Sequence, residues 1–533
     1  MERTKLTPLV VSTILALLFS SSSATWEFVE YLTFLSCLTF HSPFLTNTHN
    51  LLHTKFSPLY KPILQSSLQN LRFSSSSTPK PRYILTPSNS GQVHASVVCS
   101  RKHSLQIRVR SGGHDYEGLS SQADVPFVLV DLVNLRRIEI DLESNTAWVQ
   151  SGATLGELYY EIGSKSRTLA FPAGVCATIG VGGHLSGGGK GFLTRKYGLA
   201  ADNVLDAIVV NARAQVLDRE SMGEDLFWAI RGGGAASFGI VVAWKIKLVP
   251  VPPKVTVFTI PVTLEQGATD LAYKWQHVAP KLPEDLYIRA FFRVGENTKG
   301  SRTIVALFTA LYLGNADQLE PILNSSFPEL GVSSEHLQEK RWIETVQYFA
   351  GNKRGEKLED LKNRYWAEKG YWVAKSDFVS EPISKESLRA LWEVMLKGEP
   401  GLLFWDPYGG KMESVSESET PFPHRKGNLY NIQYYSKWQK AGDGEEKAHR
   451  EWINSVYNFM TPLVTKNPRG AYLNYRDLSL GSNGGDGFAS FEDAKVWGES
   501  YFKGNFKRLA RIKAKVDPEN YFRNEQSIPP LFD

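Results

Sequence analysis

RSGGHDYEG, at residues 110–118, and FPAGVCATIGVGGH, at residues 171–184, are the two stretches that decide how this chain folds and what it holds. Each presents one nucleophilic side chain, His114 or Cys176, in a glycine-rich loop where the backbone can come close to a ligand. Between Gly174 and Gly198, nine of the twenty-five residues are glycine, which is more than turns alone require. Backbone amides without side chains form concavities for anions such as a pyrophosphate. The two stretches therefore predict a nucleotide cofactor attached to the protein at two points.

Two common nucleotide-binding motifs do not fit the sequence. A P-loop needs Gly-Lys followed by Ser or Thr, but Lys190 is followed by Gly191. The dinucleotide fingerprint of a Rossmann strand also fails, because Gly232 and Gly234 are followed by Ser237 where a third glycine is required. These mismatches disfavour phosphoryl transfer and nicotinamide chemistry.

Length and composition are those of an ordinary globular protein with more than one domain. A chain of 533 residues is too long for one simple core, and 42% of it is hydrophobic and 22% charged. The net charge of +5 is small for this length, which argues weakly against a nucleic-acid-binding protein.

The first residues have the organisation of a secretory signal. Arg3 and Lys5 give a basic start, residues 9–19 are apolar, and Ser22-Ser23-Ala24 forms a small-residue cleavage site. The apolar run is far shorter than the roughly 20 residues that a membrane span needs. We expect a cleaved signal peptide at residues 1–24, no membrane span, and a mature protein in the extracellular space or cell wall, with the secretory pathway or the vacuole as alternatives.

The three cysteines fit a secreted chain with one disulfide and one spare thiol. Cys37 follows an apolar stretch and Cys99 sits in another, so both look structural and could join the N-terminal segment to the following domain. Cys176 is then the spare thiol, either a ligand-bonding side chain or a plain buried one. The sequon at Asn324 predicts a glycosylation site.

Hydrophobic patterning predicts an α+β protein with a boundary at residues 250–253. Before the boundary, strands are expected at residues 106–109, 127–132, 146–150, 207–211 and 239–249, with helices at 155–162 and 225–230. After it, strands are expected at 255–262 and 303–313, helices at 264–278 and 384–395, and a basic helical stretch at 496–517. The second half is therefore predicted to be an antiparallel sheet backed by helices.

Five segments carry a family resemblance that is too long and ordered for chance. The segments are RSGGH at 110–114, PAGVC at 172–176, RKYGLAADN at 195–203, DLFWAIRGGG at 225–234 and NEQS at 524–527. They resemble plant berberine bridge enzyme-like (reticuline oxidase-like) flavoproteins, and the likeness runs from about residue 28 to the end. The resemblance implies a two-part FAD-binding domain of the vanillyl-alcohol-oxidase (PCMH) type and a substrate domain with an antiparallel sheet backed by helices.

On this resemblance the chain divides into five parts. They are the signal peptide (1–24), an N-terminal helical segment (25–77), the FAD-binding domain (78–252), the substrate-binding domain (253–470) and a C-terminal segment that returns to the FAD domain (471–533).

The resemblance also implies how the cofactor is held. FAD would be bonded bicovalently, through its 8α-methyl to His114 and through ring position 6 to Cys176. Further positions that match cofactor-lining residues of the family are Arg110, Ser111, Gly112, Gly113, Gly183, Gly239, Asn524 and Gln526. For Gly183 and Gly239, a role in shaping turns is an equally good interpretation.

The substrate side is predicted from the strand at residues 429–435. Asn431 and Gln433 share one face of that strand, and neither is an acid or a base. Hydride transfer from an alcohol needs a base for the hydroxyl proton, and the matching family segment makes Tyr475 the candidate. Relatives that oxidise monolignols have a lysine where Asn431 stands, so Lys190 is considered as a substitute cation.

Three further positions complete the expected site. Tyr116 and Tyr197 match family positions that contact substrate or flavin, and an ordinary packed tyrosine is the alternative for each. Ile179 matches the position that gates dioxygen, and a residue larger than valine there predicts slow reoxidation by oxygen. No metal site is expected.

The sequence thus predicts a secreted flavoprotein that oxidises a CH–OH group of a carbohydrate or phenolic alcohol. Its partners would be a small-molecule or oligosaccharide substrate and dioxygen or another electron acceptor, with no nucleic acid or membrane, and it would be a monomer. Two alternatives stay open: oxidative ring closure of a specialised metabolite of alkaloid or cannabinoid type, and a catalytically idle wall protein that retains the fold.

Overall fold

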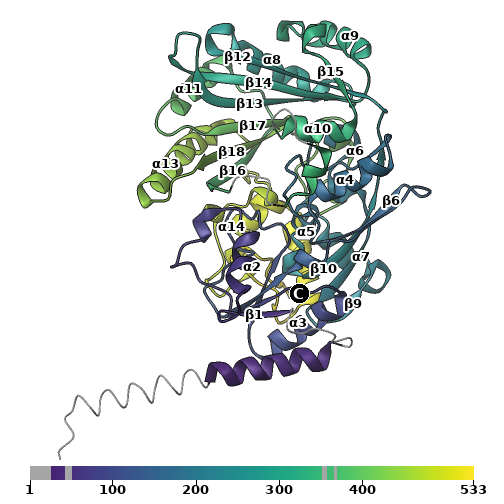
Figure 1. Cartoon of the computed structure of the whole chain (residues 1–533). Coiled ribbons are helices and arrows are strands. Elements are labelled where there is room, and N and C mark those ends of the chain that lie inside the picture. Colours follow the sequence, from purple (N-terminus) through teal and green to yellow (C-terminus); the bar gives the residue numbers. More distant parts are fainter. Residues whose placement is uncertain (1–25, 43–50, 351–356, 365–368, 533) are drawn as a thin grey trace, which may run out of the picture.

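The structure is a computed structural model that describes residues 26–42, 51–350, 357–364 and 369–532. The predicted signal peptide, residues 1–24, lies outside the described residues. Among the helices of the described part, none combines the length and the apolar character needed to cross a bilayer. Figure 1 shows the chain in two halves, each built around its own sheets, with the C-terminal segment in yellow running back into the lower half.

The first sheet of the lower half begins the cofactor-binding part. Its strands stand in the order β1 (Leu52–Thr54), β2 (Tyr83–Leu85), β4 (Phe127–Asp131) and β3 (Gln106–Arg110). β2, β4 and β3 run parallel, while β1 is antiparallel to β2. Every residue of β4 is buried, as expected of a strand in a parallel sheet that is covered on both faces. Helix α3 (Ser90–Lys102), capped by the Asn89 side chain, packs against this sheet.

The second sheet of this half is antiparallel and supports the glycine-rich loops. Its strands stand in the order β5 (Ile138–Asp141), β6 (Thr146–Gln150), β10 (Gly239–Lys247), β8 (Val204–Asn211) and β9 (Val216–Leu217). The helices that accompany it are α4 (Leu155–Lys165), α5 (Val181–Ser186), α6 (Thr194–Tyr197) and α7 (Arg219–Ile230). A two-stranded sheet of β7 (Leu169–Ala170) and β11 (Val249–Pro250) closes this half at the predicted boundary.

The upper half is one seven-stranded antiparallel sheet, as the patterning predicted. Its order is β15 (Gln338–Lys340), β12 (Val255–Thr263), β14 (Arg302–Tyr312), β13 (Leu286–Glu296), β17 (Leu402–Pro407), β18 (Tyr430–Trp438) and β16 (Tyr371–Val379). Helices α8 (Ala268–Val278), α9 (Ala316–Ser326), α11 (Lys385–Met395) and α13 (Asp443–Met460) share a hydrophobic core with one face of this sheet (Figure 1). Alternation along β18 puts Tyr430, Ile432 and Tyr434 into that core and sends Gln433 and Tyr435 to the opposite face.

The C-terminal segment returns to the lower half as two helices. We expected one basic helical stretch over residues 496–517, but the structure has α14 (Phe491–Phe502) and α15 (Asn505–Val516). The break lies at Lys503, whose positive φ of 45° is incompatible with a continuous helix, followed by Gly504. Both helices contribute to the core that holds α4, α7 and the second sheet.

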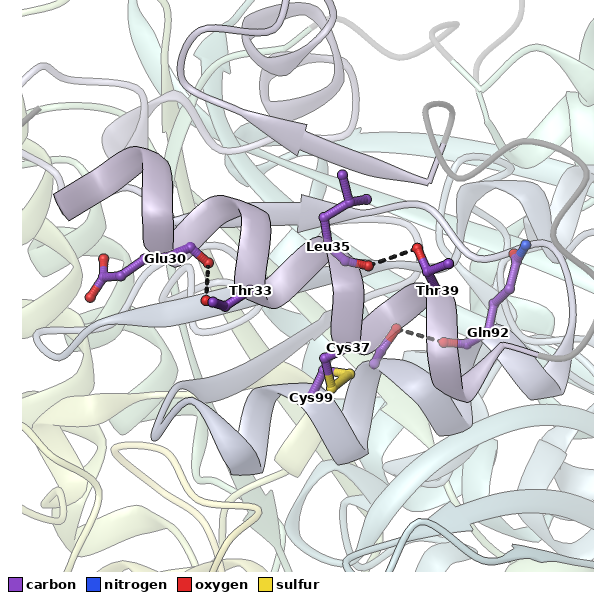
Figure 2. The surroundings of a disulfide bond; sticks show 8 residues. Glu30, Thr33, Leu35, Cys37, Thr39, Gln92 and Cys99 are labelled. Carbon is purple, nitrogen blue, oxygen red and sulfur yellow. Dashed lines mark hydrogen bonds between the residues drawn. A yellow bond between two sulfur atoms is a disulfide. The ribbon is translucent and has the colours of Figure 1, made fainter. Parts of the chain in front are cut away.

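The predicted disulfide is present and ties the N-terminal helix (residues 26–41) to α3. Cys37 and Cys99 are bonded, and Cys176 is the free cysteine of the described residues. Figure 2 shows the two helices side by side at the disulfide. Phe34 and Leu38 of the N-terminal helix are fully buried in the same hydrophobic cluster as the disulfide. The predicted sequon residue, Asn324, is exposed on α9.

Candidate functional site

A cavity of about 1110 Å³ is lined by residues of both halves. The lower half contributes the loop after β3, the loop that holds Cys176, the start of α5 and the start of β10. The upper half contributes the face of its sheet that is not covered by helices, and the C-terminal segment supplies the turn at Leu473–Tyr475 and residues 523–524. Expected site residues that line the cavity are Ser111, Gly112, Gly113, His114, Tyr116, Cys176, Ile179, Gly183, Gly239, Gln433, Tyr475 and Asn524.

His114 and Cys176 converge on one side chain, Thr178. The Nε2 atom of His114 lies 2.9 Å from the Thr178 hydroxyl oxygen, and the Cys176 sulfur lies 3.5 Å from the same oxygen. Burial lowers the pKa of His114 to about 4, so the imidazole is neutral near pH 7 and keeps a lone pair on one ring nitrogen. The two predicted attachment points, sixty-two positions apart in the sequence, therefore face the same part of the cavity.

The cavity wall has features that suit a nucleotide cofactor. A Cβ added at Gly183 would have no protein atom within 4 Å, so this glycine leaves open space. Among the described residues, the Ser151 hydroxyl and the Nε and Nη1 donors of Arg108 are buried without a hydrogen-bond partner, and both residues line the cavity. Phosphate oxygens would accept from such donors. The residues present thus fit FAD in chemistry and in space.

Close packing accounts for three of the other predicted glycines. A Cβ at Gly112 would lie 2.2 Å from the Gly180 nitrogen, and a Cβ at Gly239 would lie 2.6 Å from a backbone oxygen of β8. Gly113 has a φ of +70°, and a Cβ there would collide with the Ser67 carbonyl oxygen. Gly239 is therefore required by close packing of β10 against β8 rather than by a turn, whereas the space beside Gly183 fits a ligand.

Tyr475 and Tyr116 stand together in the cavity wall, next to Gln433 of β18. Their rings meet edge to face with centroids 6.0 Å apart, and Gln433 Nε2 donates to the Tyr116 hydroxyl over 2.8 Å. Within the described part of the chain, the Tyr475 hydroxyl makes no hydrogen bond. Burial raises the pKa of Tyr475 well above its ordinary value, and the Asp406 carboxylate adds to the effect. The Tyr475 hydroxyl therefore stays protonated near pH 7 unless another group helps it to ionise.

A charged cluster that sequence analysis did not identify lies beside Tyr475. Asp406, on β17, is buried, pairs with Lys190, and accepts from Arg289 Nε over 2.6 Å and from the Tyr287 hydroxyl over 2.8 Å. Burial alone would raise the pKa of Asp406, but Arg289 and Lys190 together hold it well below its usual range. The available sequence signal was Asp406, the single charge within the apolar strand Leu402–Pro407, and Arg289 within the apolar start of the strand Leu286–Glu296.

Four expected site residues do not line the cavity. Arg110 is buried in an ion pair with Asp131 and donates to two backbone carbonyls, and Gln526 donates to backbone carbonyls at residues 477 and 481. Tyr197 donates its hydroxyl to the Pro250 carbonyl. Asn431 turns its amide to the Asp377 carbonyl instead of following Gln433 into the cavity. Arg110, Gln526 and Asn431 all donate to backbone carbonyls around the site, and the Asn431 side-chain oxygen is buried without a hydrogen-bond partner in the described part of the chain.

In the described ranges, no group of three or more histidine, cysteine, aspartate or glutamate side chains is arranged to hold a metal ion.

Comparisons with known proteins place two family matches on this chain. Residues 81–219 match the FAD binding domain family, and residues 471–529 match the berberine and berberine-like family. The first match covers His114, Cys176 and the glycine-rich loops, and the second covers Tyr475 and Asn524.

Similar whole proteins are found among plant enzymes and pollen proteins. The berberine bridge enzyme-like protein Cyn d 4 of Cynodon dactylon is 52% identical over 501 residues, covering 93% of each chain. The tetrahydroberberine oxidase of Berberis wilsoniae is 48% identical over 527 residues, covering 98% of this chain and 97% of its own. The crystal structure of Phl p 4, a grass pollen allergen with glucose dehydrogenase activity, superposes with a TM-score of 0.88 at 48% identity, covering 94% of this chain and all of that one. An isoleucine-to-valine variant of Phl p 4 is described as a glucose oxidase.

Proposed function

Because this chain belongs to the berberine bridge enzyme-like family of FAD-dependent oxidoreductases, we propose that it oxidises a CH–OH group of a carbohydrate or phenolic alcohol. The observation that carries the proposal is a single cavity that is lined by both kinds of residue the reaction needs. His114 and Cys176 line it as the proposed points of cofactor attachment, and Tyr475 lines it with a hydroxyl that makes no hydrogen bond within the described part of the chain. The proposal includes secretion of the mature protein after removal of residues 1–24 and glycosylation at Asn324.

The proposal includes bicovalent attachment of FAD through His114 and Cys176. Support comes from the shared contact with Thr178, which brings an imidazole nitrogen and a sulfur to the same end of the cavity. Burial keeps His114 neutral, which a nucleophilic imidazole requires. Two bonds would hold the cofactor in place even though the cavity is large enough for a bulky substrate beside it. FAD, when bound, supplies the ring that accepts hydride.

The chain's own residues would move the proton and hold the substrate. Oxidation of CH–OH to C=O releases a hydride from carbon and a proton from oxygen, and the Tyr475 phenolate would take the proton. Gln433, which already holds the Tyr116 hydroxyl, would fix the orientation of the substrate hydroxyl. Trp372 and Phe404 line the same cavity and offer flat apolar surfaces to a sugar or an aromatic ring.

The substrate class is argued from the cavity and from the relatives. A relative at 48% identity is a glucose dehydrogenase, which favours a carbohydrate. Another at 48% identity is a tetrahydroberberine oxidase, which makes oxidation of an alkaloid-type metabolite the second candidate. No carboxylate projects from the cavity face of β18, where Gln433 and Tyr435 stand. The site thus lacks a carboxylate base on this strand for ring closure, and we rank the alcohol first.

A panel of substrates tests the function. The purified holoenzyme is mixed anaerobically with glucose, cello- and galacturonide oligomers, monolignols and benzylisoquinolines, and bleaching of the flavin absorbance is followed. We expect bleaching by a sugar or phenolic alcohol and a loss of at least an order of magnitude in its rate in Tyr475→Phe. Bleaching by benzylisoquinolines alone would favour the second candidate, and bleaching by no compound would favour an idle protein.

Denaturation followed by filtration tests the attachment. Yellow colour should stay with the wild-type polypeptide and with each of the His114→Ala and Cys176→Ala variants. Only the double variant should release the cofactor completely. Release from the denatured wild-type chain would rule out covalent attachment, whatever the substrate.

A further inference from the structure

The Tyr475 hydroxyl needs a positive charge nearby if it is to ionise in its buried position. The titratable and charged groups that face it come from five places: Lys190 in the loop after α5, Arg289 on β13, Asp406 on β17, Tyr116 in the loop after β3, and Tyr472 in the same turn. Two of these groups are cations and one is an anion, so the set carries one net positive charge at neutral pH. No acidic group other than Asp406 belongs to this set.

Lys190 is the cation that lies against the Tyr475 ring. Its ammonium nitrogen is 5.2 Å from the ring centroid and 5.8 Å from that of Tyr472. Lys190 is buried, and burial lowers its pKa, whereas the neighbouring Asp406 carboxylate raises it. The pairing with Asp406 therefore both fixes the ammonium in position and helps to keep it protonated.

We propose that Lys190, held against the Tyr475 ring, acts together with Arg289 to favour ionisation of the Tyr475 hydroxyl, and that Asp406 positions Lys190 for this task. The proposal rests on the proposed role of Tyr475 as the base, and it assigns one of the two assisting charges to the glycine-rich loop. Strand β18 supplies no positive charge at position 431, because this residue is Asn431, whose side-chain amide donates a hydrogen bond to the Asp377 carbonyl. Arg289, which shares Asp406 with Lys190, also lines the cavity.

The test measures ionisation at position 475 directly, without a substrate. Tyr475 is replaced in the holoenzyme by 2,3,5-trifluorotyrosine through stop-codon suppression, because its hydroxyl ionises at lower pH than that of tyrosine. The fluorine resonances then report its pKa. In the Lys190→Met background we expect the pKa of this residue to rise by about 1–3 units, the usual effect of losing an opposite charge at this range.

Matched variants separate the charge from a packing effect. Lys190→Gln removes the charge but keeps a donor for Asp406, and it should raise the pKa as Lys190→Met does, whereas Lys190→Arg should leave it close to the wild-type value. Lys196→Met is the control, because Lys196 pairs with the partly exposed Asp285 and neither residue lines the cavity. Both neutral variants keep the Arg289–Asp406 pair, so the buried charges stay balanced.

An unchanged pKa at position 475 in both neutral variants would overturn the proposal. Because no turnover is involved, this result is distinct from failure of the proposed function, which would appear as an unbleached flavin in the wild-type protein.

Discussion

Ile179 stands in the cavity wall three residues after Cys176, and its size offers a simple experiment. Replacement by valine removes one methylene from a wall that faces the cofactor end, so dioxygen should reach that end more easily. We expect Ile179→Val to increase the rate of reoxidation of the reduced enzyme by an order of magnitude or more. Stopped-flow mixing of the anaerobically reduced protein with air-saturated buffer measures this rate.

The stability of the Ile179→Val variant should change little, by about 0.5–1.5 kcal/mol. Ile107→Val is a matched control, because Ile107 also lines the cavity but stands on β3. Fast reoxidation of the wild-type enzyme, or equal acceleration by both variants, would contradict a specific gate at Ile179.

At the scale of elements, β17 is linked to the glycine-rich loop by Asp406. Removing the charge of Asp406 leaves the buried cations Lys190 and Arg289 without the carboxylate that both of them contact. We expect Asp406→Asn to lower the free energy of unfolding by about 3–5 kcal/mol, as for other broken buried pairs. Asp285→Asn, which breaks the partly exposed pair with Lys196, should cost only about 0–1 kcal/mol. Chemical unfolding of the three proteins at pH 7 measures both.

The difference in unfolding free energy between the wild type and Asp406→Asn should depend on pH in one direction. The folded-state pKa of Asp406 lies below its unfolded value, so its stabilisation is complete above pH of about 4 and is lost as the pH falls further. The gap in stability between wild type and Asp406→Asn should therefore be constant near neutrality and narrow in acid. A stability difference that grows below pH of about 4 would contradict the ion pairs of Asp406 with Lys190 and Arg289.

The elements were predictable because their signals are local. The strands at residues 127–132 and 146–150 were recognised from apolar runs and alternation and are found as β4 and β6. The break between α14 and α15 was missed, although Gly504 after Lys503 is the kind of residue that ends a helix. Seven strands from widely separated segments make the upper sheet, and their order could not be read from a single sequence.

The site was predictable only in part, for the same reason. His114 and Cys176 sit in loops whose glycine content is visible in the sequence, and both line the cavity. The contact of Lys190 with Asp406 joins residues 216 positions apart, and no local pattern reports it. Tyr197 shows the opposite case, since a motif match placed it at the site while its hydroxyl bonds the Pro250 carbonyl.

At the scale of the whole molecule, the disulfide fastens the N-terminal helix to the cofactor-binding half. Cys37 and Cys99 are 62 positions apart, and closing a loop of that length restricts the unfolded chain. We expect the Cys37→Ser/Cys99→Ser variant to lose about 2–4 kcal/mol of unfolding free energy. Denaturant titration of the oxidised protein and the double variant measures it. Limited proteolysis should also cut the N-terminal helix faster in the variant, and equal stability and equal cutting would refute a stabilising role.

Arg523 and Asn524 form part of the cavity wall although they lie among the last residues of the chain. Until these two residues have folded back onto the lower half, the cavity wall is incomplete on one side. A chain that ends at residue 522 keeps α14 and α15 but loses this side of the wall, so we expect it to retain flavin less well than the full chain.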